Sequence, residues 1–171
     1  MDRIWAPWRI QYILEERPAP GSCVFCEKNA ASDNKNALVL LKGVSAFAMM
    51  NLYPYNAGHV LVAPYRHTSC ITELDSDELL EIMEIARSIV SATRTALTHH
   101  GFNMGFNIGQ AGGAGIADHI HFHIVPRWNG DGNFMPALGN TRIISEHIES
   151  TYEKIIEALG GSEACRTTQG G

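Results

Sequence analysis

The run "HIHFHIV" at residues 119–125 constrains the fold more than any other stretch of this chain. Its histidines, His119, His121 and His123, alternate with large apolar residues. Successive side chains of a β-strand point to opposite faces of a sheet, so the pattern predicts a strand with one apolar face and one face of imidazoles. Histidines on one face lie roughly 6 to 7 Å apart, which suits a shared grip on one small anion such as phosphate.

The rest of the chain supplies partners for this strand. "ALVLL" and "VSAFAMM" are typical of a hairpin, "GHVLVAP" of a third strand and "MGFNI" of a fourth. From Asp75 onward apolar residues recur at intervals of three and four, and Asp75 with Glu78 has the pattern of a capping box, which predicts a long helix. A closing helix is expected over residues 145–159. This order predicts an α+β fold, an antiparallel sheet of about five strands with a long helix packed on it and a C-terminal helix.

Length and composition favour one domain. The chain has 171 residues, of which 45% are hydrophobic and 18% charged, an ordinary composition for one compact core. We expect an N-terminal arm over residues 1–22, packed on a single domain over residues 23–159. The small polar residues from 160 to 171 predict a disordered tail.

Composition also bears on compartment and partners. No apolar run reaches the roughly 20 residues that span a bilayer, and residues 1–18 lack the pattern of a signal peptide, so we expect a cytoplasmic protein with no membrane partner. Cys70 and Cys165 stand apart from the other cysteines, as thiols in a reducing compartment usually do. The net charge of −5, without a basic stripe, argues against a nucleic-acid partner.

The histidines themselves suggest two chemistries. A neutral imidazole can attack an electrophile with one nitrogen while a hydrogen bond holds the other, and the middle histidine, His121, is best placed to do so. Glycines in the preceding turn, Gly112, Gly113 and Gly115, let backbone N–H groups approach phosphate oxygens. Alternating histidines on a strand also bind zinc. Spacing alone leaves the nucleophile and the metal ligand as open alternatives.

These motifs resemble one known family. "HIHFHIV" has the His-x-His-x-His-x-x signature, with x apolar, of the histidine triad (HIT) nucleotide hydrolases and transferases. "WAPWR", "NLYPYNAGHVLVAP" and "GDGNFMP" are similar to its bacterial branch of diadenosine tetraphosphate phosphorylases and hydrolases. The resemblance implies an antiparallel sheet with helices and a homodimer whose sheets join.

The resemblance also implies roles for individual residues. His121 matches the nucleophile that forms a covalent nucleotidyl-histidine, and His119 and His123 match its supporting histidines. Asn51 matches a position that binds the nucleoside ribose, and Asn107 one that contacts phosphate. Many relatives have Gln four residues before the first triad histidine, where this chain has Gly115, so a side-chain phosphate donor is missing.

The pair Cys23 and Cys26 has the spacing of a redox motif or of half a zinc site. A redox motif would start a helix within a βαβ pattern, which is absent from this sequence. Zinc takes four sulfur or nitrogen ligands, and the resemblance implies that His67 and His119 complete a structural site. Two buried thiols beside an unrelated histidine remain the alternative.

Together these features predict an enzyme that cleaves dinucleoside polyphosphates through nucleotidyl-His121, with water or inorganic phosphate as the acceptor. No organic cofactor is expected. The alternatives are a hydrolase of adenosine 5′-phosphoramidates and a module that binds or senses nucleotides without turnover.

Overall fold

The structure, a computed structural model, describes residues 22–131 and 146–160. Residues 1–21 of the predicted arm and residues 161–171 of the predicted tail lie outside the described residues. The elements are, in chain order, α2 (Val24–Ala30), α3 (Asn34–Ala37), β1 (Val39–Lys42), β2 (Ala46–Met50), β3 (Val60–Pro64), the short 3-10 helix η1 (Ile71–Glu73), α4 (Ser76–Ala96), β4 (Gly101–Phe106), β5 (Phe122–Arg127) and α6 (Ile148–Ala158).

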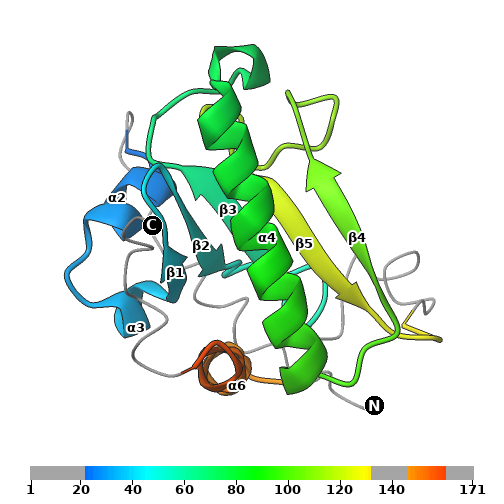
Figure 1. The fold of residues 1–171 in the computed structure, drawn as a ribbon. Helices are drawn as coiled ribbons and strands as arrows, with labels where there is room; N and C mark the ends of the chain where they lie inside the picture. The colour runs from blue at the N-terminus through cyan, green and yellow to red at the C-terminus, as the bar shows by residue number, and fades with distance from the viewer. Residues whose placement is uncertain (1–21, 132–145, 161–171) are drawn as a thin grey trace, which may run out of the picture.

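One antiparallel sheet organises the described residues. Its five strands lie in the order β1-β2-β3-β5-β4, so the first three strands form an antiparallel meander and the last strand lies between β3 and β4 (Figure 1). The predicted α+β class with about five strands is confirmed. The strand that carries His123, β5, is therefore an inner strand of the sheet and pairs with β3.

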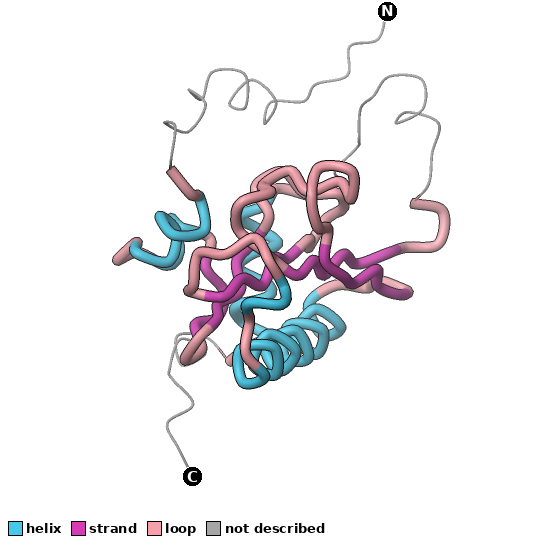
Figure 2. Tube along the Cα trace, turned by 90° about the horizontal axis from the view of Figure 1, so that it is seen from above, coloured by secondary structure: helices cyan, strands magenta, loops and turns pink. Residues whose placement is uncertain are grey.

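The long helix α4 packs on one face of the sheet. It begins as predicted: the Asp75 side chain accepts from the Glu78 backbone N–H, and the Glu78 side chain accepts from the Asp75 N–H. This reciprocal pair satisfies two of the N–H groups that a helix start leaves open. Figure 2 shows the sheet edge-on, with the long helix on one side and loops on the other. The core between α4, α6 and the sheet includes Met50, Val60, Ile82, Ile89, Ile124 and Ile155.

A second, smaller core covers the opposite face of the sheet. Phe25 from α2 is fully buried there against Phe47, Leu61 and other side chains of β1 to β3. Leu61 pairs with His123 across β3 and β5. Because directly paired residues point to the same face, the imidazole of His123 lies on this second face, away from α4.

The boundaries of several elements differ from the predictions. The strand expected over residues 119–125 pairs only from Phe122 to Arg127, so His119 and His121 lie in the segment that leads into β5. The predicted alternation still holds, since Ile120, Phe122 and Ile124 all belong to the core under α4. β4 begins at Gly101, three residues earlier than predicted, because it continues to pair with β5 as far as Arg127.

None of the described helices combines the length and the apolar character that crossing a membrane would require.

Candidate active site and metal cluster

His121 presents one nitrogen for chemistry. Its Nδ1 lies 2.8 Å from the backbone carbonyl oxygen of His119, and a carbonyl only accepts, so Nδ1 carries the proton and donates. The neutral ring therefore has its lone pair on Nε2. Burial lowers the pKa of His121, and the bond to His119, which raises it, offsets only part of that effect. A buried, neutral imidazole with a fixed tautomer is the form that a nucleophilic histidine needs.

A chain of hydrogen bonds fixes the tautomer of His123. The backbone N–H of Tyr55 donates to His59 Nδ1 at 3.0 Å, so the neutral His59 ring carries its proton on Nε2. His59 Nε2 lies 3.0 Å from His123 Nδ1 and donates to it. His123 then carries its own proton on Nε2, a buried atom for which the described residues offer no partner. His123 therefore holds an N–H ready for an external acceptor.

His123 is neutral at physiological pH. Burial, together with the neighbouring His121, lowers the pKa of His123 to about 4. The rings of His121 and His123 are adjacent, with centroids 4.7 Å apart. The pair thus offers one lone pair and one N–H side by side, which suits attack on a phosphorus and stabilisation of an oxygen bound to it.

His59 is a residue of the site that the sequence motifs did not single out. It is fully buried and immediately precedes β3, two residues before Leu61. Period-two alternation would assign it the same face as Leu61. The pairing of β3 with β5 brings it next to His123, and this pairing cannot be predicted from the sequence pattern.

Asn51 also lies in this network. Its Oδ1 accepts from the Tyr53 backbone N–H, which directs Nδ2 toward His59 Nδ1 at 3.1 Å. Asn51 is partly buried, and it is joined to the histidines at the edge of the site. Its predicted ribose contact stays a prediction.

His119 has a different environment from the other two triad histidines. Its Nε2 donates to the carbonyl oxygen of Pro64 at 2.9 Å, which leaves the lone pair on Nδ1. Nδ1 faces two sulfurs, at 3.2 Å from Cys23 Sγ and 3.7 Å from Cys26 Sγ. The His119 ring thus turns to the cysteines, while its backbone carbonyl orients His121.

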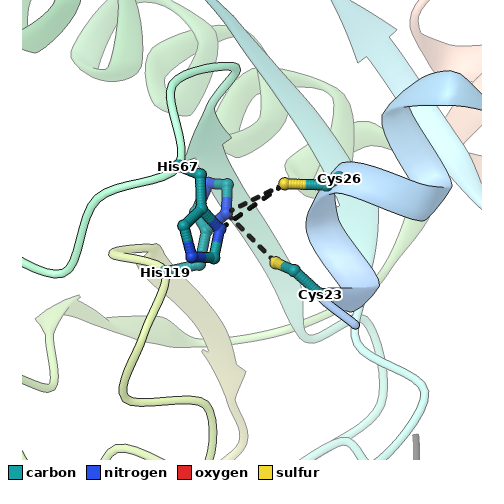
Figure 3. A group of neighbouring side chains, drawn as sticks. All are labelled: Cys23, Cys26, His67 and His119. Atoms are coloured by element: carbon teal, nitrogen blue, oxygen red, sulfur yellow. Dashed lines mark hydrogen bonds between the residues drawn. The ribbon is translucent and has the colours of Figure 1, made fainter. Parts of the chain in front are cut away.

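One group of four side chains could hold a metal ion, and we call this group the metal cluster: Cys23, Cys26, His67 and His119. The ligand atoms lie within 4.8 Å of one another, and Cys26 Sγ is 3.5 Å from His67 Nδ1. Figure 3 shows both sulfurs, one at the start of α2 and one inside it, pointing toward the imidazoles. All four residues predicted to bind zinc meet here.

The donor set fits zinc. Bonds of about 2.0 to 2.3 Å to nitrogen and sulfur in a tetrahedron put neighbouring ligand atoms at roughly 3.5 Å. Three of the sulfur-to-nitrogen distances in the cluster, 3.2, 3.5 and 3.7 Å, lie close to this value. His121 and His123 stand outside the group of described residues that could share one ion. The geometry therefore puts the possible metal ligand, His119, and the possible nucleophile, His121, in different environments.

The loop that carries His67 is held from two sides. Arg66 donates from Nε and Nη2 to the carboxylate of Glu78, in the capping box of α4. The carbonyl oxygen of Thr68 accepts from the Ile120 N–H at 2.6 Å. This loop therefore ties the start of α4 to the segment that carries His119 and His121.

The glycine loop, residues 109–115, precedes that segment. Gly113 has a φ of +85°, a conformation that L side chains rarely adopt, and its N–H donates to the Gln110 carbonyl at 3.0 Å. The N–H of Gly112 donates to Gly109. These two groups are engaged within the loop, so the expected approach to phosphate would require the loop to rearrange at Gly112 and Gly113.

Gly115 and Asn107 lie at the two ends of this region. A Cβ built on Gly115 would meet no atom within 4 Å, so the position opens onto free space. The last pair between β4 and β5 joins Phe106 to Phe122. Continued by one residue, this register would put Asn107 opposite His121, and the predicted phosphate contact of Asn107 stays a prediction.

The fold and the triad define a class of protein, and the comparison with known families agrees. The family described as HIT domain matches residues 32–130 of the chain. The chain belongs to the HIT family. An AP-4-A phosphorylase of Mycobacterium tuberculosis is 35% identical over 158 residues, which cover 88% of this chain and 80% of that protein. An uncharacterized HIT-like protein of Saccharolobus solfataricus is 30% identical over 141 residues, covering 80% and 97%.

Solved structures also match the chain. A zinc-bound histidine triad family protein from Mycobacterium smegmatis matches with a TM-score of 0.64 and 28% identity, over 81% of this chain and 93% of that one. A uridylyltransferase matches with a TM-score of 0.63 and 20% identity, over 89% of this chain and 48% of that one. At that identity the second match concerns the fold alone.

Proposed function

We propose that this protein cleaves dinucleoside polyphosphates by nucleotidyl transfer to His121. The observation that carries the proposal is the pair of fixed tautomers, a lone pair on His121 Nε2 beside an N–H on His123 Nε2. The 35% identity to an AP-4-A phosphorylase supports a nucleotide substrate of this kind.

The reaction takes two displacements. His121 Nε2 forms a bond to the α-phosphorus, and the bond from that phosphorus to its bridging oxygen breaks. The electron pair leaves with the polyphosphate, whose oxygen accepts the hydrogen bond from His123. An oxygen of water or phosphate then attacks the phosphorus, and the nitrogen–phosphorus bond breaks to return the lone pair to His121. When the acceptor is water, the proton that it loses passes to the solvent. Both steps rely on positioning and charge stabilisation.

The hydrogen-bond chain favours polyphosphate over phosphoramidate substrates. An amine leaving group is strongly basic and needs a full proton, whereas a polyphosphate needs only a hydrogen bond. Beyond His123, the His59 Nδ1 atom faces the N–H groups of Tyr55 and Asn51, and neither amide gives up its proton near neutral pH. With its pKa lowered to about 4, His123 is also not a reservoir of protons near neutral pH.

The metal cluster would hold zinc through Cys23, Cys26, His67 and His119. A zinc ion there would fix the start of α2 against the segment that leads into β5, and it has no part in the displacements above. We also propose a homodimer, as the resemblance implies. In the described sheet β4 is an edge strand, and its outer edge faces away from β5.

The acceptor can be tested with diadenosine tetraphosphate as donor. We expect inorganic phosphate to change the products from AMP and ATP to ADP and ATP, with ADP formation saturating as phosphate rises. Chromatographic separation of the nucleotides measures both outcomes. AMP as the sole partner of ATP at millimolar phosphate would make the enzyme a hydrolase, and no turnover of any adenylyl donor would favour the sensing module.

Gly115 offers a matched variant for this measurement. The resemblance puts a phosphate-contacting Gln at this position, where a Cβ atom would meet no other atom within 4 Å. We expect Gly115→Gln to fill room that the acceptor phosphate uses and to lower the ratio of ADP to AMP about 10-fold or more. Gly115→Ala, which adds one methyl group, should leave the ratio nearly unchanged; an equal effect in both variants would contradict this role.

The pH dependence should reflect neutral histidines. His121 and His123 both have pKa values below the ordinary value of 6.5, that of His123 at about 4. We expect kcat/KM to stay constant as the pH is lowered to 6.5 and to decrease only at lower pH. Between about pH 4 and pH 6.5 the unfolded chain binds more protons than the folded one. The free energy of unfolding should therefore decrease as the pH is lowered through that window. An acid limb centred above 6.5 in the pH profile of kcat/KM would contradict the assignment.

A further inference from the structure

Phe25 connects the metal cluster to the nucleophile. It lies between Cys23 and Cys26 in the sequence, on α2, and its side chain is fully buried. Its ring centroid is 5.0 Å from that of His119 and 4.8 Å from that of His121. One aromatic ring thus contacts both a metal-cluster imidazole and the catalytic one.

The hydrogen bond from His121 Nδ1 leaves part of the ring's orientation open. The bond to the His119 carbonyl fixes one nitrogen, but the torsion that turns an imidazole about its Cβ–Cγ bond has a broad energy profile. The ring contacts Phe25, tilted by 33°, and His123, tilted by 53°. These two contacts limit the tilt of the imidazole and therefore the direction of the Nε2 lone pair.

We propose that Phe25 is a positioning residue for His121. The helix that carries the two cysteines then also sets the direction of the His121 Nε2 lone pair. The inference rests on the proposed function. Its physical basis is that attack on phosphorus needs a near in-line approach, and a displacement of about 1 Å can cost about 10²-fold in rate. Loss of the ring should therefore lower kcat while substrate binding, which uses other surfaces, changes little.

Phe47 provides a matched control. It is also fully buried and belongs to the same small core, but its aromatic contact is with Tyr65, at 5.7 Å and 11°. Phe25→Leu and Phe47→Leu remove the same atoms from the same side of the sheet. A purely structural role would make the two variants alike.

The kinetic test compares the two variants at equal metal content. We expect Phe25→Leu, and Phe25→Met as a second substitution, to lower kcat at least about 10-fold with KM within about twofold. Phe47→Leu should keep kcat within about twofold. Equal losses of kcat in Phe25→Leu and Phe47→Leu would overturn the proposal, as would an unchanged kcat in both Phe25 variants.

A spectroscopic test does not depend on turnover. Nitrogen-15 NMR of the imidazoles distinguishes a ring protonated on Nδ1 from one protonated on Nε2. We expect one Nδ1-protonated signal for His121 in the wild type and in Phe47→Leu, and a broadened or second signal in both Phe25 variants. An unchanged signal in those variants would overturn the positioning role. If the protein turned over no nucleotide, the proposed function would fail while this measurement would still decide the role of Phe25.

Discussion

Replacing His121 with alanine should lower turnover of diadenosine tetraphosphate by about 10³-fold or more, with the fold intact. The reason is that His121 Nε2 carries the lone pair of the site, while the Nδ1 nitrogens of His119 and His59 face sulfurs and backbone. Steady-state kinetics measure the loss, and mass spectrometry of quenched wild-type enzyme should find a nucleotidyl adduct on His121. The alanine variant should show no adduct.

His123 supplies the comparison. His123→Ala should lower the rate less than His121→Ala does, because a lost hydrogen bond to the leaving oxygen costs only part of the stabilisation of the transition state. It should also still form the adduct, more slowly. An active His121→Ala variant would exclude the covalent mechanism, and an adduct on His123 in the wild type would exchange the two roles.

The alternation of residues 119–125 predicted the face of each side chain correctly, although hydrogen-bonded pairing starts only at Phe122. The sequence pattern predicts which side chains are buried, and burial depends only on the direction in which they point. Hydrogen-bonded strand pairing also requires an adjacent strand, and β4 pairs with β5 no further than Phe106. The same logic explains α4, whose cap and period are local features and were both predicted from the sequence.

What the sequence could not reveal are contacts between distant segments. His59 meets His123 across a gap of 64 residues, through the pairing of β3 with β5. The split role of His119, with its ring toward the cysteines and its carbonyl toward His121, depends on where α2 lies. The glycine loop was expected to offer N–H donors, but the donors of a loop depend on its own turns, which engage Gly112 and Gly113.

The second large effect concerns the metal. We expect close to one zinc per chain in protein purified without chelator, and none in the double variant Cys23→Ser, Cys26→Ser. Helix α2 has seven residues, and its N-cap, Cys23, makes no capping bond from its side chain within the described structure. A helix this short is marginal without tertiary support, so the cluster is expected to hold it in place. Elemental analysis measures the metal directly.

Loss of the metal should also destabilise the fold and slow the reaction. Structural zinc contributes binding free energy to folding, and a loss of about 3 kcal/mol would lower Tm by roughly 6 to 12 °C in a chain of this size. Cys70→Ser is the matched control, since the Cys70 thiol contacts Thr72 and stands outside the cluster. It should keep both zinc and Tm. A wild type that contains no zinc and keeps its Tm in chelator would reduce Cys23 and Cys26 to packing residues, and the link from α2 to His121 would then rest on Phe25 alone.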